Sequence, residues 1–504
     1  MKGPGVVASS CLLLMLPVQW LPGAASASSP SIAQQIEQLQ TAFPDLRHGH
    51  IGLKFVDADT GETLAEKDAD GLFIPASNVK LYTTALALER LGSEYRFTTT
   101  VLAGPGWSKG QSTVNGIRLL GGGDPNLSGR ILPFSQDAKA GDPLAAINQL
   151  ADQIANQGIR RVQGDVIGDD TRYPYSPYPG GWTFDDGLWY YGTPVSALAV
   201  NDSAVHVRVV PAAAGELAEV YVTPDVDCFI VQNRIVTVAG GETHVSMARR
   251  PGSNELVLSG TIGESAPPVD EDLGVPDPAL FAARALKTAL EDRGIAVDGD
   301  AIAEHSELTE APSVLASNQV APPAELASLK SAPLSQVIQI VNKVSQNLHA
   351  EMLLREVGLQ TRQTGTLDAG LNERDAFLEQ AGIPHDSFSM VDGSGLARQN
   401  LASPSSTVML LQYMWKTPQR DVWLASLPTG GADGSLHQRF RNVAGAERIH
   451  AKTGSMSHVS ALSGYLQRKN GSWVIFSMMA NSEADEDARE VRNYLDRVCE
   501  LFLN

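Results

Sequence analysis

A serine and a lysine lie three positions apart in FIPASNVK, residues 73–80, and a helix-like run, LYTTALAL, follows at residues 81–88. Residues at that spacing share one face of a helix, so Ser77 and Lys80 are expected to meet. A lysine held beside a hydroxyl, partly out of water, can lose its proton and act as the base for serine attack. The start of a helix adds free backbone N–H groups and the positive end of its dipole. The stretch therefore predicts a serine nucleophile with a lysine base.

Two more triplets complete a pattern. Ser345-Gln346-Asn347 is the only Ser-x-Asn in the chain, and Lys452-Thr453-Gly454 is the only Lys-Thr-Gly. The order Ser-x-x-Lys, Ser-x-Asn, Lys-Thr-Gly resembles the signature of penicillin-binding proteins and serine β-lactamases. Each triplet alone is a weak signal, and three unrelated surface triplets in this order are improbable. The triplets are therefore expected to form one site.

The second triplet is expected at a junction between two helices. A second helical run follows it at residues 348–354, so Ser345 and Asn347 can turn into a cleft. Five apolar residues before the triplet follow helical spacing and predict one buried stripe: Leu334, Val337, Ile338, Val341 and Val344.

The third triplet is expected along a sheet edge. Residues 459–466 and 473–479 read as two strands, and residues 469–471, Lys-Asn-Gly, read as their hairpin turn. A peptide or a β-lactam could pair with such an edge as an added strand. Gly454 would let the ligand backbone come close.

Length and charge limit the classes of protein. At 504 residues the chain exceeds one ordinary core, so two or three domains are expected. The net charge of −19 argues against nucleic acid or an anionic membrane surface as a partner. The ten histidines show no ligand spacing, so neither a metal nor another cofactor is expected.

The N-terminus has the layout of a secretory signal peptide over residues 1–27. Lys2 precedes an apolar run, and a small-residue stretch, AASA at residues 24–27, allows cleavage. Pro17 and Pro22 break the run, although a retained anchor remains an alternative. We expect export to the periplasm, as a soluble or loosely membrane-associated protein. Cleavage would leave only Cys228 and Cys499, which make no disulfide framework and are expected to be buried thiols.

The long gap between the first two triplets predicts an insertion. Short alternating segments with Gly and Pro punctuation, such as residues 205–210 and 256–260, indicate β-rich domains. The resemblance to penicillin-binding proteins and serine β-lactamases implies an α/β fold, with a transpeptidase-like catalytic domain of helices around an antiparallel sheet and a large β-rich insertion of two smaller domains. The expected division is residues 28–99 and 323–504 for the catalytic domain, 100–191 and 283–322 for inserted domain II, and 192–282 for domain III nested in domain II.

The layout resembles the class C low-molecular-mass penicillin-binding proteins, the D-alanyl-D-alanine carboxypeptidase/endopeptidases of peptidase family S13. Beyond the triplets, the resemblance rests on residues 120–125 (LGGGDP), 164–170 (GDVIGDD), 181–194 and 392–400 (DGSGLARQN). Family members usually carry serine where this chain has Ala397, a departure that touches no assigned role. The resemblance implies the fold just described, peptidoglycan stem peptides as substrates and β-lactams as covalent inhibitors.

The resemblance also implies catalytic roles. Ser77 would attack the carbonyl between two D-alanines, with Lys80 as base. Ser345 and Lys452 would relay a proton to the leaving amine, and Asn347 would orient the substrate amide. The backbone N–H groups of Ser77 and Ser455 would form the oxyanion hole. The terminal carboxylate would be held by Lys452 with the Thr453 and Ser455 hydroxyls, beside Gly454.

A second part of the site is implied for the side chain of diaminopimelate. Its free amino end would face Asp186 and Tyr191, and its other walls would be Arg398, Met456 and Ser457. A carboxylate facing an ammonium and a guanidinium facing a carboxylate suit that zwitterionic group. The alternative interpretation of residues 182–191, where five aromatic rings surround two carboxylates, is an aromatic core patch with loop aspartates.

Two other functions stay open from the sequence. A β-lactamase shares the triplets, although the large insertion favours the peptidase. A non-catalytic peptidoglycan-binding or penicillin-sensing module would not need the intact Ser77, Lys80 and Lys452. The sequence sets neither the oligomeric state nor the balance of carboxypeptidase and endopeptidase action. The segment DGSG at residues 392–395 lacks the Gly-x-Ser-x-Gly of a nucleophile elbow and is expected to be a turn.

Overall fold

A five-stranded antiparallel sheet carries the third triplet and draws its strands from both ends of the chain. The computed structural model describes residues 1, 3, 5, 30–138, 141–250, 252–306, 323–483 and 489–503, so the predicted signal peptide lies almost wholly outside the described residues. The strand order is β19-β20-β21-β1-β2. The strands are β1 (His50–Asp57), β2 (Thr63–Lys67), β19 (Ile449–Met456), β20 (Val459–Gln467) and β21 (Trp473–Asn481). The predicted hairpin is confirmed as β20 and β21, and β19, which contains the Lys-Thr-Gly triplet, is an edge strand.

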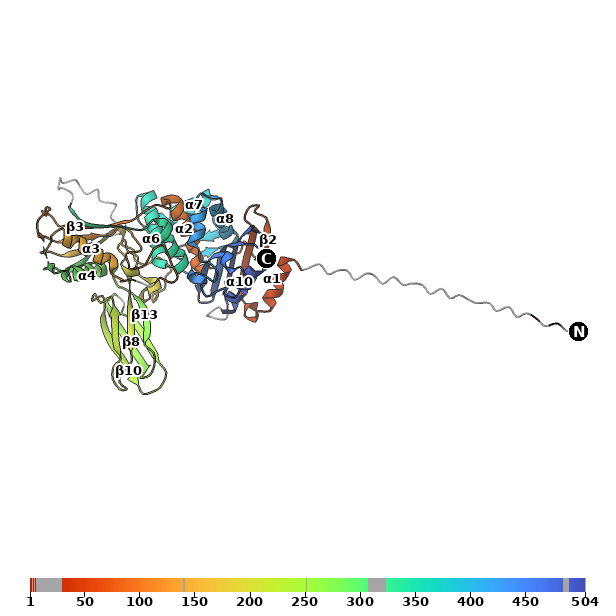
Figure 1. The fold of residues 1–504 in the computed structure, drawn as a ribbon, viewed down its shortest axis with the longest axis horizontal. Helices are drawn as coiled ribbons and strands as arrows, with labels where there is room; N and C mark the ends of the chain where they lie inside the picture. Colours follow the sequence, from red (N-terminus) through yellow and green to blue (C-terminus); the bar gives the residue numbers. More distant parts are fainter. Residues whose placement is uncertain are drawn as a thin grey trace.

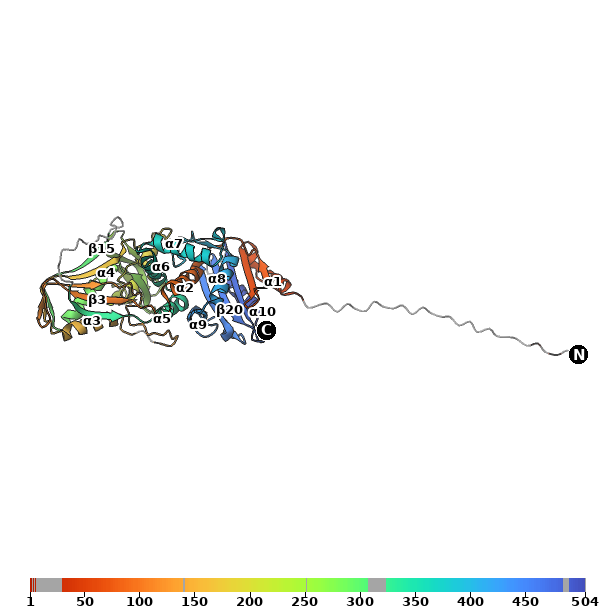
Figure 2. The ribbon, with the colours of Figure 1, turned by 90° about the horizontal axis from the view of Figure 1, so that it is seen from above.

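Helices cover both faces of this sheet, as Figures 1 and 2 show. One apolar core joins the sheet to α2 (Val79–Leu91) and α8 (Pro404–Lys416), and a second joins it to α1 (Ile32–Thr41) and α10 (Arg489–Leu501). Val491, Leu495, Val498 and Phe502 face the second core, as their spacing predicts. The other elements of this part are α5 (Leu334–Gln339), α6 (Asn347–Arg362), α7 (Leu367–Gln380), α9 (Arg420–Ser426), β17 (Phe388–Ser389) and β18 (Leu401–Ala402).

Val344 is not part of the buried stripe predicted for the helix before Ser345. Leu334, Val337, Ile338 and Val341 are buried, whereas Val344 is 46% exposed. Residues Ile340–Val344 form a π-helical turn, which changes the angle between successive side chains. The helix then ends at Ser345 in the left-handed conformation, with φ of +66°. This prediction was therefore wrong at its last residue.

A second, mixed sheet lies beside the catalytic part. Its order is β15-β7-β5-β3-β16, and α3 and α4 pack against it. The elements are β3 (Thr98–Ala103), β5 (Ile117–Leu120), β7 (Val166–Pro174), β15 (Ala301–Ser306), β16 (Glu325–Lys330), α3 (Ala145–Asn156) and α4 (Pro278–Glu291). A small sheet next to it joins β4 (Thr113–Val114), β6 (Arg161–Val162) and β14 (Ala296–Val297).

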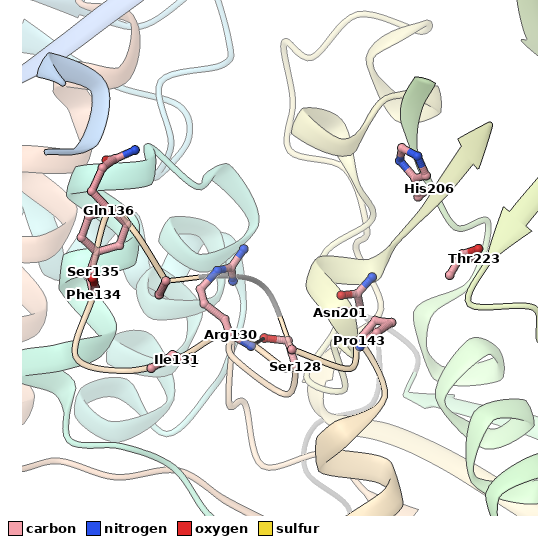
Figure 3. A pocket seen from close by; sticks show the side chains of 13 residues that line it. Ser128, Arg130, Ile131, Phe134, Ser135, Gln136, Pro143, Asn201, His206 and Thr223 are labelled. Atoms are coloured by element: carbon pink, nitrogen blue, oxygen red, sulfur yellow. Dashed lines mark hydrogen bonds between the residues drawn. The ribbon is translucent and has the colours of Figure 1, made fainter. Parts of the chain in front are cut away.

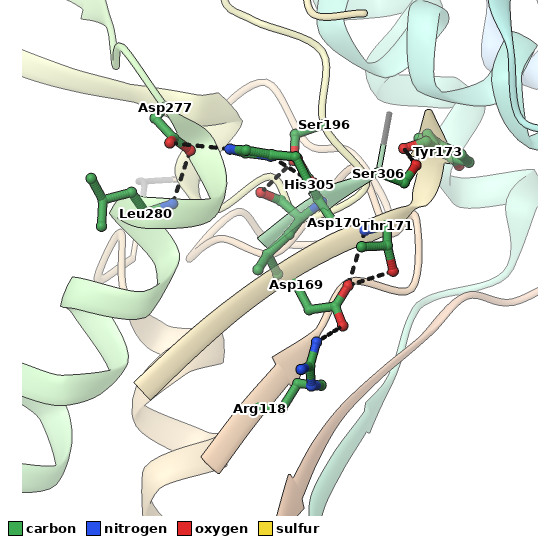
Figure 4. A network of polar contacts seen from close by, with 11 residues as sticks. Arg118, Asp169, Asp170, Thr171, Tyr173, Ser196, Asp277, Leu280, His305 and Ser306 are labelled. Atoms are coloured by element: carbon green, nitrogen blue, oxygen red, sulfur yellow. Dashed lines mark hydrogen bonds and ion pairs between the residues drawn. The ribbon is translucent and has the colours of Figure 1, made fainter. Parts of the chain in front are cut away.

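His305 ties this sheet to α4 (Figure 4). Its Nδ1 lies 2.8 Å from Asp170 on β7, and its Nε2 lies 3.3 Å from Asp277, the residue that caps α4. Asp170 also accepts a hydrogen bond from Ser196 at 2.8 Å. The hydrogen bonds to Asp170 and Asp277 raise the pKa of His305 to about 10 despite its partial burial. The imidazolium therefore bridges two carboxylates at neutral pH.

Two three-stranded sheets make a third part, which projects away from the rest (Figure 1). One has the order β13-β8-β9 and the other β10-β12-β11. The strands are β8 (Ala204–Val210), β9 (Glu219–Thr223), β10 (Ile230–Val238), β11 (His244–Arg249), β12 (Glu255–Gly263) and β13 (Val269–Gly274). Cys228 here and Cys499 in α10 are both buried and unpaired, as expected.

The predicted fold class, an α/β catalytic part with a large β-rich insertion, is confirmed. β16 pairs with β3, although the expected division gave residues from 323 onward to the catalytic domain. We propose that the insertion spans residues 98–330 and that residues 204–274 form the nested domain within it. Among the described residues, no helix is both long enough and apolar enough to cross a membrane.

Candidate active site

Ser77 and Lys80 meet at the start of α2. Ser77 lies in a short 3₁₀ turn, Ala76–Asn78, that leads directly into the helix. Ala76 has a φ of +46°, a left-handed conformation that L-residues other than Asn and Asp seldom adopt. Backbone strain of this kind concentrates at functional sites. The strained residue directly precedes the predicted nucleophile.

Lys80 is fully buried and points at three oxygen atoms. Its Nζ lies 2.9 Å from Ser77 Oγ and 2.5 Å from Asn347 Oδ1. It also donates to the backbone carbonyl of Ser394 at 2.6 Å. Burial lowers the pKa of Lys80 to about 7, although the negative charges of Asp392 and Glu351 oppose the change. A substantial fraction of Lys80 is therefore neutral near pH 7 and can accept the serine proton.

Lys452 makes the matching contact with the other serine. Its Nζ donates to Ser345 Oγ at 2.8 Å and to the Thr453 carbonyl at 2.8 Å. Burial, and then the charge of Lys80, lower the pKa of Lys452 well below its usual range. The left-handed conformation of Ser345 turns this residue out of its helix. Residues from all three triplets therefore converge on one site.

The strand that carries Lys452 lies directly against the turn that carries Ser77. A Cβ on Gly454 would meet the Pro75 carbonyl oxygen at 2.5 Å, so a larger residue would push β19 away. Thr453 donates to Ser435 Oγ at 2.8 Å. Ser455, one residue further on, is exposed. The glycine thus allows the close approach of the strand, rather than only that of a ligand as the sequence suggests.

A cleft of about 490 Å³ collects most of the predicted site residues. Ser77, Ser345, Asn347 and Ser455 line it, whereas Lys80, Lys452, Thr453 and Gly454 are not among its lining residues. All five residues of the predicted side-chain pocket line the same cleft: Asp186, Tyr191, Arg398, Met456 and Ser457. The rest of the wall is formed by Thr183, Tyr190, Val344, Gln346, Gly395 and Leu396.

Contacts within the cleft hold the predicted pocket next to the nucleophile. The side chain of Asn347 donates to the Tyr191 carbonyl at 2.7 Å, which links α6 to the loop that carries Asp186. Asp186 accepts a hydrogen bond from the Thr183 amide at 2.6 Å. Arg398, also in the lining of the cleft, donates to the Ser457 carbonyl at 3.1 Å. Thr183, Asp186, Tyr190 and Tyr191 therefore line the cleft, which disfavours the core-patch interpretation.

The loop that supports Lys80 is a part of the site that the sequence patterns did not indicate. Asp392 accepts hydrogen bonds from the amides of Gly395 and Ala397, at 2.8 Å each. Glu351 accepts hydrogen bonds from the amides of Gly393 and Ser394, also at 2.8 Å each. These contacts orient the Ser394 carbonyl toward Lys80. The segment is a turn, as expected, but it is also part of the site. One signal was available, because Glu351 lies four residues after Asn347 and so shares its helix face.

A smaller cleft of about 390 Å³ lies apart from these residues (Figure 3). Phe134 and Gln136 line the cleft on the side of the catalytic part, where Gln136 accepts a hydrogen bond from the Gly434 amide at 2.9 Å. His206 and Thr223 come from strands of the third part. Arg130 on its wall donates to Asp202 at 2.5 Å. None of the predicted site residues lines this cleft.

Asp202 connects that wall to the buried face of α6. It accepts hydrogen bonds from both Arg130 and His349, whose Nε2 lies 2.8 Å away. Burial alone would raise the pKa of Asp202, but its interactions and hydrogen bonds with His349 and Arg130 hold that pKa well below its usual range. In the described part of the chain, no group of three or more His, Cys, Asp or Glu side chains is arranged to hold a metal ion.

Known proteins resemble this chain in sequence and in fold. The sequence model of the D-Ala-D-Ala carboxypeptidase 3 (S13) family matches residues 32–500. A D-alanyl-D-alanine carboxypeptidase of Actinomadura sp. (strain R39) is 34% identical over 479 residues, which cover 92% of this chain and 84% of that protein. The crystal structure of penicillin-binding protein 4 (dacB) from Haemophilus influenzae matches with a TM-score of 0.78 at 20% identity, over 93% of this chain and 99% of that one. A complex of that Haemophilus protein with a β-lactam matches with a TM-score of 0.74 at 20% identity, over the same shares of the two chains.

The protein is therefore a serine-type peptidase with the penicillin-binding protein fold. It belongs to the D-Ala-D-Ala carboxypeptidase 3 (S13) family and is a D-alanyl-D-alanine carboxypeptidase, as the family resemblance of the sequence implies.

Proposed function

We propose that Ser77 cleaves the bond between two D-alanines of peptidoglycan stem peptides through an acyl-enzyme. Ser77 Oγ attacks the carbonyl carbon while neutral Lys80 takes the hydroxyl proton. The C–N bond then breaks, and the leaving D-alanine amine receives a proton through Ser345 and Lys452. Water hydrolyses the Ser77 ester and releases a peptide that is shorter by one D-alanine. The serine recovers its proton in that step.

The remaining groups of the cleft hold the substrate during these steps. The backbone N–H groups of Ser77 and Ser455 stabilise the oxyanion as it develops. Asn347, which contacts both Lys80 and the Tyr191 carbonyl, orients the substrate amide. The terminal carboxylate binds at Lys452, Thr453 and Ser455, beside Gly454, where the edge of β19 is free to pair with an extended peptide.

The far end of the cleft suits the zwitterionic end of a diaminopimelate side chain. Asp186 faces its ammonium and Arg398 its carboxylate, and Tyr191, Met456 and Ser457 complete the wall. The position of these residues in the same cleft as Ser77 supports this assignment. An endopeptidase action on cross-linked stems follows if the leaving group is the side-chain amine of a second stem.

One observation carries the proposal: a fully buried lysine with a pKa lowered to about 7 lies 2.9 Å from the Ser77 hydroxyl. The test is the Ser77→Ala variant, incubated with fluorescent penicillin and with a stem pentapeptide. We expect the variant to lose both covalent labelling and D-alanine release while its thermal unfolding stays close to that of the wild type. Labelling at normal stoichiometry would reject Ser77 as the nucleophile.

Two rival functions are separated by simple assays. A β-lactamase deacylates fast, so sustained rapid turnover of nitrocefin would favour it over a peptidase whose penicilloyl ester is long-lived. A non-catalytic binding module would release no D-alanine from the pentapeptide. We propose β-lactams as covalent inhibitors whose ester with Ser77 hydrolyses slowly. The signal peptide predicted from the sequence is consistent with an enzyme that acts on peptidoglycan outside the cytoplasm.

A further inference from the structure

A second and larger cavity, of about 930 Å³, adjoins the catalytic cleft. Thr183, on the loop that carries Asp186, lines both spaces, so they are neighbours. Residues of that loop, between Tyr178 and Leu188, form one wall of the larger cavity. The other wall is formed by the end of β11, residues 247–249, and by residues 252–254. The cavity therefore lies between the active-site loop and the third part of the molecule, and the mechanism assigns it no role.

Aromatic rings give this cavity its character. Phe184 is 81% exposed and Tyr178 is 40% exposed, although both carry large apolar surfaces. Trp182 lies beside Tyr178, with ring centroids 6.5 Å apart at 60°. Exposed aromatic side chains gathered in a concave site mark a binding surface.

The walls of the cavity are fixed before any ligand arrives. Arg249 on β11 donates to the Gly187 carbonyl at 2.8 Å and to the Tyr178 hydroxyl at 3.3 Å, which fastens the strand to the loop. A Cβ on Gly187 would meet the Tyr178 ring at 3.1 Å, so the ring packs tightly against the loop backbone. Trp182 Nε1 donates to Asp392 at 3.1 Å. A preformed site costs little ordering entropy when it binds.

We propose that this cavity binds an N-acetylated amino sugar of the glycan strand that carries the stem peptide. The C–H face of a pyranose ring packs on an aromatic ring, as Phe184 and Tyr178 allow. Its hydroxyl and acetamido groups need nearby polar partners, which Asp185, Asn254 and Arg249 supply around the wall. One acidic and one basic group suit a neutral polyol better than a polyanion.

The position of the cavity next to the catalytic cleft, with Thr183 in both linings, favours this occupant over an unrelated ligand. The inference rests on the proposed function, because peptidoglycan joins each stem peptide covalently to an amino sugar. A peptide held at Ser77 and Asp186 therefore brings its own sugar close to the neighbouring cavity, at a high effective concentration. Binding of this remote group would lower KM for the natural substrate.

The experiment compares a disaccharide-linked stem pentapeptide with the same pentapeptide without sugar. We expect the wild type to favour the sugar-linked substrate by about fivefold to tenfold in kcat/KM, mainly through KM. Phe184→Ala should remove that preference and leave the free pentapeptide unchanged, whereas Phe184→Trp should keep it. Tyr221→Ala is the matched control, because Tyr221 is an exposed aromatic (52%) outside this cavity.

The outcomes are separable. The sugar site would be overturned by equal kcat/KM for the two substrates in the wild type, or by an equal loss of kcat/KM on both in Phe184→Ala. The proposed function would still stand in either case, because D-alanine is released. A third substrate is a cross-linked peptide dimer without sugar. If the wild type also favours this dimer over the free pentapeptide in kcat/KM, and Phe184→Ala removes that preference, the cavity binds a second peptide and the inference is overturned. Absence of D-alanine release from both substrates would remove the proposed function and the inference together. Penicillin labelling of each variant reports that its active site is folded.

Discussion

Lys80 and Lys452 are both fully buried in one site, where each ammonium group faces a different serine. Lys80 lies 2.9 Å from Ser77 Oγ and Lys452 lies 2.8 Å from Ser345 Oγ. Burial lowers the pKa of both lysines, and the charge of Lys80 lowers that of Lys452 further. The site therefore favours the neutral form of each lysine more strongly than water does. One lysine is placed to receive the proton of the nucleophile and the other to pass one to the leaving group.

Lys80→Arg is expected to be nearly as damaging as Ser77→Ala. Arginine keeps the charge but does not become neutral in a protein, so it cannot accept the Ser77 proton. The measurement is the rate of acylation by fluorescent penicillin, with unfolding curves to show that the variant folds. Lys54→Arg serves as the control, since Lys54 contacts Glu66 away from the cleft. Acylation within about tenfold of the wild type, ~1.4 kcal/mol in barrier, would place the base elsewhere.

The acylation rate is expected to rise with pH through an apparent pKa near 7. Burial lowers the pKa of Lys80 from 10.5 to about 7, so below this pH the lysine is protonated and cannot act as base. Above it the neutral form dominates and the rate should reach a plateau. The measurement is the second-order rate constant for penicillin acylation between about pH 5 and pH 9. A rate independent of pH over this range would exclude Lys80 as the titrating base.

Gly454→Ala is expected to slow acylation strongly. The new methyl group would approach the Pro75 carbonyl at 2.5 Å and Ala76 Cβ at 3.3 Å, so β19 must move away from the turn that carries Ser77. That shift would separate the Ser455 amide from the Ser77 amide and weaken oxyanion stabilisation, by about tenfold or more in rate. Gly180→Ala is the matched control, because its Cβ would meet no atom within 4 Å. An unchanged acylation rate in Gly454→Ala would mean that the strand tolerates the displacement.

The local parts of the site were predictable from the sequence. The three triplets carry their chemistry in residue type and spacing, and the hairpin of β20 and β21 follows from two apolar runs around a Lys-Asn-Gly turn. The prediction that Asp186 and Arg398 line a pocket for a substrate side chain came from family resemblance, because nothing in their local sequence shows that they line a cleft.

Features that depend on contacts distant in the sequence were not predictable. The Ser394 carbonyl reaches Lys80 only because Glu351, on another element, holds the amides of its loop. The exposure of Val344 follows from a π-helical turn, for which an apolar pattern gives no signal. β16 has no local feature that distinguishes a strand of the second sheet from one of the first.

His305→Gln is expected to lower thermal stability, and more at low pH than at high pH. The hydrogen bonds to Asp170 and Asp277 raise the pKa of His305 from 6.5 to about 10 in the folded state. A raised folded pKa gives stability that is fully present below pH 6.5 and is lost as the pH rises through about 10. The measurement is the difference in Tm between wild type and variant at pH 6 and at about pH 10. A difference that does not shrink at the higher pH would contradict an ionic bridge.

Asp186→Asn is expected to separate two kinds of substrate. If Asp186 holds the ammonium of a diaminopimelate side chain, the change removes a charge-assisted hydrogen bond worth roughly 1.5–3 kcal/mol. Peptides with that free amino end should lose about tenfold to a hundredfold in kcat/KM. Simple penicillins lack the group and should acylate Ser77 almost as before. The measurement is kcat/KM for the peptide beside the penicillin acylation rate.

Asp185→Asn supplies the matched control for this comparison. Asp185 is the neighbouring carboxylate, but it lines the larger cavity and not the catalytic cleft. Its loss should therefore leave both a sugar-free peptide and penicillin unaffected. In Asp186→Asn the hydrogen bond from the Thr183 amide to residue 186 is kept, because the asparagine side-chain oxygen also accepts it. Equal losses of Asp186→Asn on peptide and penicillin would consequently mark Asp186 as a residue that shapes the loop, and no loss on either would place it outside the binding site.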